Sequence, residues 1–264
     1  MLTLLLACTV PASVPLDTSW ALVWSDSFDG PVGTVPDPEV WVPDVGGDGW
    51  GNEQLEYDTD RAENASLDGE GRLVITAIAE AYEGRAYTSA RLTTKGTYSH
   101  GYGRYEADLQ LPAGQGLWPA FWLLGTDIDT VGWPDCGEVD ILEQKGEDPD
   151  TSYATVHGPG YSGSGGLSAD YSLRDGTFAD GVHTFAVDLD PDSVAFWVDD
   201  ARVQVLHPGD LPSNTEWVFD TEWFMILNLA VGGFFVEEPS DPSVFPATLI
   251  VDEVRVYERA QANP

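Results

Sequence analysis

The chain has 264 residues, of which 42% are hydrophobic, with 28 Gly, 18 Pro and ten each of Trp, Tyr and Phe. Disordered proteins lack this aromatic and apolar content, so the composition predicts a folded chain of short strands separated by turns. The 45 Asp and Glu residues against 11 Lys and Arg give a net charge of −34, which disfavours nucleic acid and sulfated or uronic polysaccharides as partners and favours a neutral one.

The acid excess has two interpretations. A hydrated carboxylate surface keeps a protein soluble in a saline habitat, where salt also screens the self-repulsion. An acidic secreted protein without any adaptation to salt fits equally well, so both remain open.

Residues 1–19 are predicted to be the remnant of a signal sequence and a tether. The run 4–8 reads Leu-Leu-Leu-Ala-Cys, with a small residue before Cys8 as at a bacterial lipoprotein cleavage site, although the apolar stretch is short and no Lys or Arg precedes it. We expect a lipoprotein signal whose start is missing, a lipid anchor on Cys8, and a location outside the cell or on its surface. An ordinary signal or a chance run is the alternative.

The remaining chain is expected to be one domain, spanning residues 20–260. Its composition is even from Trp20 to Tyr257, without repeats, Ser-rich linkers or charge blocks. Cys8 and Cys136 are the two cysteines, which excludes a disulfide framework and a cysteine metal site. No later segment approaches the roughly 18 apolar residues of a membrane-spanning helix. We expect a monomer.

Hydrophobic periodicity in this domain is close to two residues. In segment 104–111, Tyr105, Ala107 and Leu109 alternate with polar residues, and no window of 11 or more residues keeps an apolar stripe at helical spacing. Many short strands predict an all-β fold, either a sandwich or a barrel, and we expect a jelly-roll β-sandwich with a concave cleft. The predicted strands are 72–79, 104–111, 183–190, 193–198, 202–206, 223–229 and 249–257.

The segment 133–144 carries the most informative residues. On a strand, Glu138 and Asp140 share one face, whereas Glu143, five positions after Glu138, falls on the apolar face. A β-bulge at Ile141 and Leu142 would return Glu143 to the acidic face. Ordinary acids on a solvent-facing edge strand are the alternative, but the nearby tryptophans at 118, 122 and 133 suit sugar faces better than open water.

Such a bulge would leave the Glu138 and Glu143 Cα atoms roughly 13 Å apart, at ~3.3 Å per residue. Side chains that lean together close much of this gap, and about 5–5.5 Å between carboxyls is the geometry of a retaining glycosidase. Asp140, between them, is predicted to hold a proton or a hydrogen bond and to keep the two pKa values apart.

The segment resembles the active-site strand of glycoside hydrolase family 16, in the bulged form Glu-x-Asp-x-x-Glu of laminarinase-like endo-β-1,3-glucanases. Other blocks resemble the same subgroup in the same order, at 51–57, 88–96, 114–122, 156–163 and 227–233. The resemblance implies that Glu138 is the nucleophile, Glu143 the acid/base and Asp140 the assisting carboxylate. It also places six residues in a glucan cleft: Asn52, Arg91, Trp118, Trp122, Trp133 and His157.

Each cleft residue also has a structural interpretation. Trp118 and Trp122 share a strand face with Ala120 that would form a cleft floor, but a tryptophan is also an ordinary core residue. Arg91 would either bind sugar hydroxyls or pair with an acid. His157 has no second His beside it in the sequence, so we expect a hydrogen-bonding role rather than metal ligation.

The calcium site of the family is altered in this chain. Where the family often has Asp-Glu-Phe-Asp-Gly, residues 26–30 read Asp-Ser-Phe-Asp-Gly, so Ser27 replaces the Glu, while Asp252 matches the late Asp. A calcium shell rich in oxygen ligands tolerates a lost charge poorly. We expect no required cofactor, and a structural calcium at Asp252 stays open.

The sequence thus predicts a retaining endo-β-1,3-glucanase acting on a neutral, laminarin-like β-glucan. A mixed-linkage β-1,3-1,4-glucanase or a galactan-cutting relative is the first alternative, and a transglycosylase remains open. A non-catalytic glucan-binding module would be marked by loss of Glu138 or Glu143, and both are present.

Overall fold

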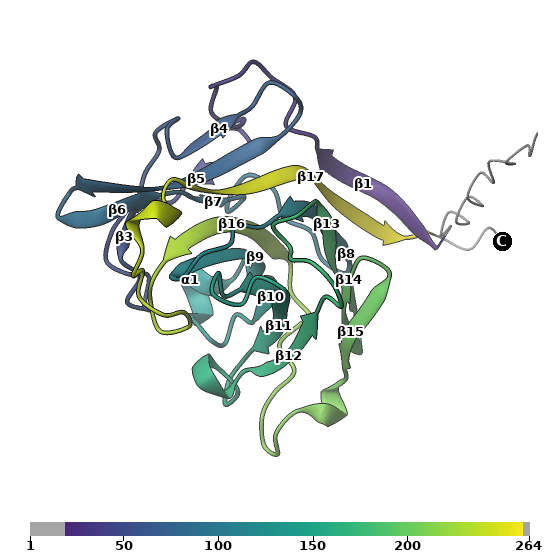
Figure 1. Cartoon of the computed structure of the whole chain (residues 1–264). Helices are drawn as coiled ribbons and strands as arrows, with labels where there is room; N and C mark the ends of the chain where they lie inside the picture. Colours follow the sequence, from purple (N-terminus) through teal and green to yellow (C-terminus); the bar gives the residue numbers. More distant parts are fainter. Residues whose placement is uncertain (1–18, 261–264) are drawn as a thin grey trace, which may run out of the picture.

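The computed structural model describes residues 19–260, and the predicted lipidation site, Cys8, lies outside them. The described chain forms two β-sheets packed as a jelly-roll sandwich, as predicted (Figure 1). The ten-stranded sheet has the order β15 (Ala201–Leu206), β14 (Ser193–Val198), β13 (His183–Asp190), β8 (Gly103–Gln110), β17 (Ala247–Arg259), β5 (Leu73–Tyr82), β6 (Arg85–Ser89) and β3 (Glu56–Asp58), with β1 (Trp20–Asp26) beside β17 and β4 (Ala65–Leu67) beside β5.

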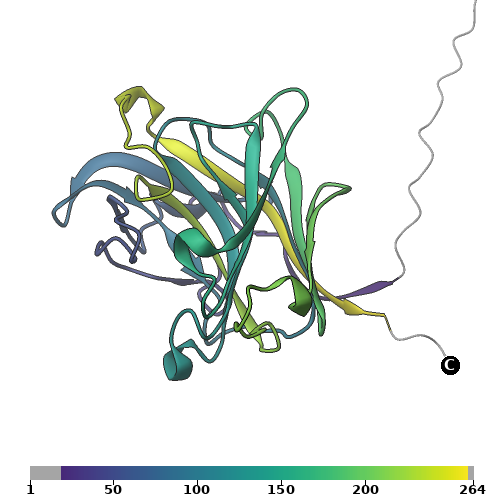
Figure 2. The same ribbon diagram turned by 90° about the horizontal axis from the view of Figure 1, so that it is seen from below.

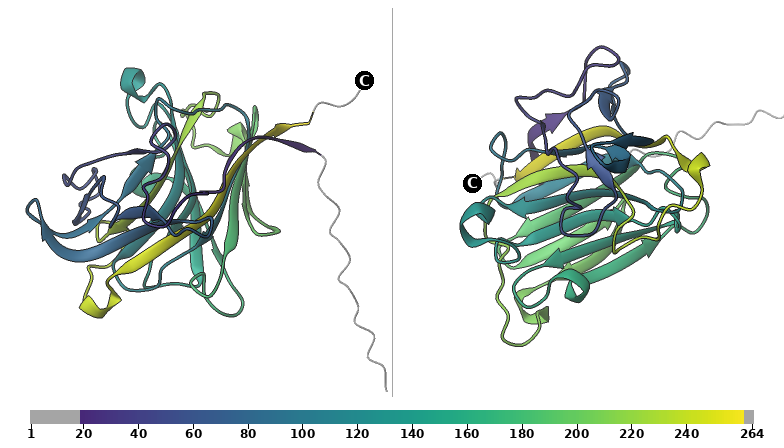
Figure 3. Two further views of the ribbon diagram at one scale, coloured as in Figure 1. Left: turned by 90° about the horizontal axis from the view of Figure 1, so that it is seen from above. Right: turned by 90° about the vertical axis from the view of Figure 1, so that its left-hand side faces the viewer.

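The second sheet has seven strands and carries the acidic segment. Its order is β12 (Leu167–Ser172), β11 (Thr151–His157), β10 (Glu138–Gln144), β9 (Leu117–Gly125), β16 (Trp223–Val231), β7 (Arg91–Thr93) and β2 (Val42–Pro43). Figure 2 and Figure 3 show the layered arrangement from three further sides.

Helical structure is short throughout the described residues. The α-helix α1 (Ile128–Val131) has four residues, and the 3₁₀ helices span Gly163–Gly165, Pro208–Asp210 and Pro242–Val244. Between residues 19 and 260, no helix is long and apolar enough to cross a membrane. The absence of a helical stripe in the sequence therefore predicted the fold class correctly.

The core lies between the two sheets because alternate residues of each strand face inward. On β8, Tyr105, Ala107 and Leu109 are fully buried, and on β9, Phe121 and Leu123 meet them from the other sheet. All seven predicted strands are present, with ends that differ from the prediction by up to three residues. The short strands, such as β3 and β7, were not predicted.

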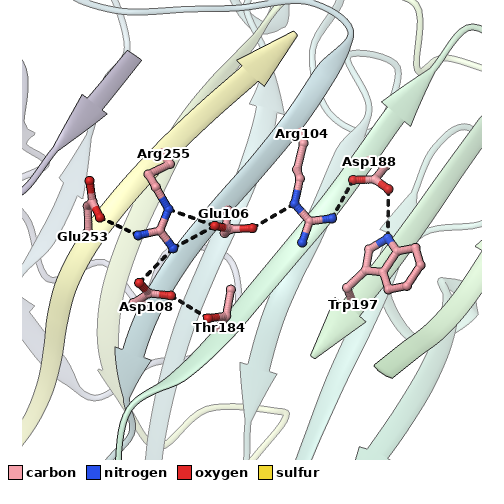
Figure 4. A network of polar contacts seen from close by, with 8 residues as sticks. All are labelled: Arg104, Glu106, Asp108, Thr184, Asp188, Trp197, Glu253 and Arg255. Atoms are coloured by element: carbon pink, nitrogen blue, oxygen red, sulfur yellow. Dashed lines mark hydrogen bonds and ion pairs between the residues drawn. The ribbon is translucent and has the colours of Figure 1, made fainter. Parts of the chain in front are cut away.

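The face of the ten-stranded sheet that points away from the core carries a network of paired charges (Figure 4). Arg255 contacts Glu106 at 2.7 Å and Asp108 at 2.8 Å, and Arg104 contacts Glu106 at 2.8 Å and Asp188 at 2.9 Å. Two arginines thus neutralise most of the half-buried acids on this face.

Candidate active site

A β-bulge places the three acids of β10 on one face. Asp140 lies opposite Thr155 of β11 and Glu143 lies opposite Tyr153, so three steps on β10 match two on β11. The register with β9 shifts at the same place. Ile141 and Leu142 are both buried in the core. The extra residue therefore turns Glu143 back to the side of Glu138 and Asp140, which confirms the predicted bulge.

Each outer carboxyl of the cluster accepts a hydrogen bond from a tryptophan. The Trp133 indole N–H donates to Glu138 at 2.8 Å, and the Trp118 indole N–H donates to Glu143 at 3.0 Å. The side chain of Trp133 is 49% exposed, whereas Trp118 is 8% exposed. Trp133 thus lies at the rim of the site, and Trp118 forms a wall behind Glu143.

His157 lies against the carboxyl cluster from β11. It lies opposite Glu138 on β11, and its Nε2 is 3.1 Å from Asp140 Oδ2 and 3.7 Å from Glu138 Oε1. Glu138, Asp140 and His157 each offer one metal-binding type of atom, all within 4.8 Å of one another. Asp140 Oδ2 and His157 Nδ1 are buried without a hydrogen-bond partner in the described part of the chain, so the hydrogen-bonding role expected for His157 stays a prediction.

Burial and mutual repulsion keep protons on this cluster. Burial raises the pKa of Glu138 to about 8, and the charge of Asp140 adds to this, while His157 and the Trp133 N–H act in the opposite direction. Burial also raises the pKa of Asp140 to about 8. Burial and then Asp140 raise the pKa of Glu143 to about 8. With pKa values raised this far above the usual range of a carboxyl, the cluster retains protons at neutral pH.

An open pocket lies over these acids. Trp122 forms part of its lining, beside Ala120, as the strand-face prediction requires. Trp118 is nearly buried, so it combines the two roles that were left open: it packs in a small apolar cluster and also lines the pocket. The lining residues are Asn52, Gln54, Arg91, Trp118, Ala120, Trp122, Glu138, Asp140, Glu143 and Asn228.

Arg91 lines the pocket and pairs with an acid, while its predicted binding of sugar hydroxyls stays a prediction. Its Nε donates to Asp44 at 3.0 Å, while its guanidinium lies over the rings of Trp50 and Trp122, 4.6 and 4.7 Å from their centroids. It therefore lines the pocket and pairs with an acid at once.

Sequence reasoning missed three residues that shape the pocket. Asn228 accepts the indole N–H of Trp122 at 2.8 Å, which fixes that ring. Trp50 covers the other side of the Arg91 guanidinium. Gln54 lines the pocket beside Asn52. Asn228 and Gln54 lie in two of the segments that resemble the family, 227–233 and 51–57, and this resemblance could have indicated that they line the cleft.

The predicted metal residue, Asp252, is not in this pocket. It is exposed on β17, where the register with β8 shifts between Val251 and Glu253. A side chain at Gly71 would lie 3.6 Å from the Ser27 carbonyl oxygen and 3.7 Å from an Asp29 carboxylate oxygen. The Ser27 carbonyl and the Asp29 carboxylate thus both lie near Gly71.

A second hollow opens beside the last residue of β8 and the first residues of β17. Its lining includes Gln110, Val244 and Ile250 and no titratable side chain. It lacks the groups needed for acid–base or nucleophilic chemistry.

Comparison with known proteins agrees with the geometry. The sequence model of "Glycosyl hydrolases family 16" matches residues 49–227. A "Beta-glucanase" of Rhodothermus marinus is 43% identical over 97% of this chain and 92% of its own length.

Solved structures are similar over nearly the whole chain. The laminarinase catalytic domain from Thermotoga maritima has a TM-score of 0.86 at 42% identity and covers 92% of this chain and 100% of its own. The endo-beta-1,3-glucanase from Pyrococcus furiosus has a TM-score of 0.88 at 39% identity and covers 96% of this chain and 100% of its own. The fold is shared with these enzymes.

Proposed function

The chain belongs to glycosyl hydrolase family 16, and from this premise we propose that it is a retaining endo-β-1,3-glucanase that cuts internal bonds of laminarin-like glucans. The observation that carries the proposal is the bulge of β10, which presents Glu138 and Glu143 on one face with Asp140 between them. Two carboxyls flanking a scissile bond are the requirement of glycoside hydrolysis.

In the proposed reaction Glu138 is the nucleophile and Glu143 the acid/base. Glu138 attacks the anomeric carbon while the protonated Glu143 gives its proton to the leaving oxygen. The Glu143 carboxylate then takes a proton from water, whose oxygen attacks the same carbon and releases Glu138. The raised pKa of Glu143, about 8, supports a proton donor at neutral pH.

Asp140 and His157 are proposed to make Glu138 the ionised glutamate and Glu143 the protonated one. The proton of Asp140 limits repulsion inside the cluster, and His157 with the Trp133 N–H favours the anion of Glu138. The two glutamates thereby keep different protonation states in the same buried site.

The proposed substrate is neutral because the recognition elements are rings and hydrogen-bonding groups. Trp122 and the exposed Trp133 offer faces for sugar rings, and Asn52 and Arg91 offer donors for hydroxyls. The net charge of −34 opposes polyanionic glycans.

A structural calcium at Asp252 is a further proposal. The Ser27 carbonyl, the Asp29 carboxylate and the Asp252 carboxylate are oxygen ligands of the type that calcium prefers. Bound calcium would tie the segment after β1 to β17 and supply no chemistry to the reaction. Melting curves with calcium or with a chelator test it: a rise in Tm with calcium is expected, and Asp252→Asn should abolish that rise.

We also propose that the protein is a cell-surface lipoprotein with its anchor on Cys8, supported by the run 4–8. Mass spectrometry of the N-terminal peptide from native material tests this. A lipidated Cys8 is expected, and an unmodified one would contradict the proposal.

Product analysis on laminarin, lichenan and agarose tests the specificity. Laminarin should give short oligosaccharides from internal cuts, with much slower cleavage of the other two. Proton NMR during hydrolysis should show the β-anomer first, as retention requires. Lichenan cleaved faster than laminarin, or an α-anomer as the first product, would contradict the proposal, and longer products at high oligosaccharide concentration would indicate transglycosylation.

A further inference from the structure

Three side chains form a stack at the pocket: Trp50, Arg91 and Trp122. The guanidinium carbon of Arg91 lies 4.6 Å from the ring centroid of Trp50 and 4.7 Å from that of Trp122. Arg91 and Trp122 line the pocket, whereas Trp50 is not among the lining residues. Between residues 19 and 260, Nε is the only guanidinium nitrogen of Arg91 that donates a hydrogen bond, so its two terminal nitrogens are left for a ligand.

Each member of the stack is tied to the fold by one side-chain acceptor. Asn228 accepts the indole N–H of Trp122 at 2.8 Å, and Asp44 accepts Nε of Arg91 at 3.0 Å. Asp58 accepts the indole N–H of Trp50 at 2.7 Å. An indole turns about two side-chain bonds, and a hydrogen bond at the N–H edge restricts both rotations. The three acceptors therefore determine how the guanidinium lies against the two rings.

Asp58 is the most deeply buried of these acceptors. It is 2% exposed and is not among the residues that line the pocket. Its backbone N–H donates to the carbonyl of Gly46 at 2.8 Å, and its carbonyl accepts the N–H of Gly46 at 3.1 Å. Burying a carboxyl costs free energy that only hydrogen bonds or opposite charges offset. Within the described residues, its Oδ2 bonds to Trp50 and its Oδ1 has no partner, so the hydrogen bond that this buried carboxyl makes is directed to Trp50.

Trp50 lies in a turn that needs such an anchor. Its φ is 51°, a conformation that is uncommon for a bulky residue and persists where neighbours hold it. Gly49 and Gly51 on either side have φ values of 86° and 78°, and glycine adds backbone freedom to the segment. The hydrogen bond to Asp58 ties the Trp50 ring to β3.

We propose that Asp58 is a positioning residue for glucan binding, which acts through Trp50 to hold the Arg91 guanidinium against Trp122. Arg91 then presents its terminal nitrogens to the sugar hydroxyls in one fixed orientation. Asp58 itself contacts neither the glucan nor the scissile bond, so its removal weakens binding and leaves the chemical step unchanged. The inference rests on the proposed glucanase function for its ligand.

Four variants separate the hydrogen bond from the charge and from general effects of substitution. Asp58→Leu removes both the acceptor and the charge at similar side-chain volume. Asp58→Asn removes the charge but keeps an oxygen that can accept the indole N–H. Trp50→Phe keeps an aromatic ring but has no N–H to donate. Asp60→Leu changes an exposed acid two residues on in the same segment and is the matched control.

Binding of a laminari-oligosaccharide of six glucose units is measured by calorimetry at pH 7, in a chain that carries Glu138→Gln so that the ligand is not cleaved. The values of KM and kcat on laminarin are measured in the active chain. With Asp58→Leu we expect Kd and KM to rise about tenfold and kcat to change less than about twofold. With Asp58→Asn and Asp60→Leu we expect all three values to stay within about twofold of the parent.

A double-mutant cycle tests whether Asp58 acts through Trp50. Trp50→Phe should also raise Kd, and the variant with both Asp58→Leu and Trp50→Phe should bind no more weakly than the weaker single variant. Independent, additive effects of the two substitutions would overturn the inference. So would an unchanged Kd in Trp50→Phe, which keeps the test valid if Asp58→Leu does not fold.

Proton NMR without ligand tests the anchor directly. The indole N–H signal of Trp50 should be protected from exchange with water in the parent and in Asp58→Asn, and unprotected in Asp58→Leu. Equal protection in all three, an unchanged Kd in folded Asp58→Leu, an Asp58→Asn variant as weak as Asp58→Leu, or a fall in kcat at constant KM would overturn the inference. A protected signal in a parent that binds no laminari-oligosaccharide would instead contradict the proposed function, and with it the role in glucan binding.

Discussion

The outer face of the ten-stranded sheet and the cleft both carry clustered acids, but the positive groups that compensate these acids differ. On the outer face of the ten-stranded sheet, the half-buried acids lie against Arg104 and Arg255. In the cleft, Glu138, Asp140 and Glu143 share one imidazole and two indole N–H groups.

The outer network and the cleft differ in how far the pKa values of their acids rise. In the outer network burial lowers the pKa of Arg255, but the carboxylates around it outweigh this and raise it well above its usual range; burial raises the pKa of Asp188, and the charge of Arg104 opposes that rise. In the cleft, burial wins and the pKa values rise to about 8. The comparison teaches that burial alone does not make an acid reactive; a buried acid that lacks a full counter-charge retains a proton it can transfer.

The largest expected effect comes from removing a cleft acid. Glu138→Gln and Glu143→Gln should each lower laminarin hydrolysis by at least about 10³-fold, because each removes a group that changes bonding or protonation in the transition state. Reducing-sugar release measures this, and Glu258→Gln, at an exposed position of β17, is the control. Near-normal turnover by either folded cleft variant would contradict the assignment.

Azide separates the two roles. With an activated aryl glucoside, azide should rescue Glu143→Ala and give a product of retained configuration, since the glycosyl enzyme still forms on Glu138. It should rescue Glu138→Ala with inverted configuration, because azide then attacks the sugar directly. The opposite pattern would exchange the roles of the two glutamates.

The second effect is a loss of stability when Arg255 is removed from the network of paired charges on the outer face of the ten-stranded sheet. Arg255→Met keeps much of the side-chain packing but leaves Glu106, Asp108 and Glu253 with less compensation. Removing one partner of a largely buried ion pair should cost about 3 kcal/mol. Chemical denaturation at neutral pH measures this, with the exposed Arg174→Met as the matched control. Equal stability of the two variants would show that the network contributes little.

The third prediction is a substitution that stabilises the fold at alkaline pH, whereas Arg255→Met destabilises it. Because the folded-state pKa of Glu143, about 8, lies above the unfolded value near 4.3, its contribution to stability is full below about pH 4.3. It is lost as pH rises through 8. Glu143→Gln does not titrate, so it should be more stable than the wild type by at least about 2 kcal/mol at pH 9 relative to the difference at pH 4. Denaturation at both pH values measures the change, and a constant difference would argue against a raised pKa.

How far the sequence predicts these two faces depends on the range of the interactions. The alternation in β8 and the odd spacing of Glu138 and Glu143 are local, and they predicted the strand and the bulge. The place of Arg91 between Trp50 and Trp122 depends on the pairing of β7 with β16, which no local pattern specifies.

The buried pair of Glu56 and Asp58 is a stronger example. Their strand has three residues and pairs with β6 in parallel, so periodicity had too little length to reveal it. Alternating acids in a short segment predict a solvent-facing edge, whereas in the fold Glu56 accepts the backbone N–H of Val231 at the end of β16. Tertiary packing overrides the local preference there.

The smallest expected effect is that of salt on Tm, and it concerns the acids that lie in neither the outer network nor the cleft. The chain has only two lysines, Lys95 and Lys145, among 11 basic residues for 45 acids, so most of the repulsion is distributed and long-range. With a Debye length of about 10 Å at 0.1 M, NaCl should raise Tm by a few degrees between low and molar salt, for roughly 1 kcal/mol of relieved repulsion. Thermal melts across a NaCl series, with KCl as a check for ion-specific effects, measure this. The rise in Tm should be larger for Arg255→Met than for the wild type, since its unpaired carboxylates add repulsion that salt can screen. For Arg174→Met, which loses one exposed charge, the rise should be close to that of the wild type. A flat or falling Tm in the wild type would mean that the acidity reflects composition without adaptation to salt, and an equal response of both variants would mean that the outer network shields its acids even without Arg255.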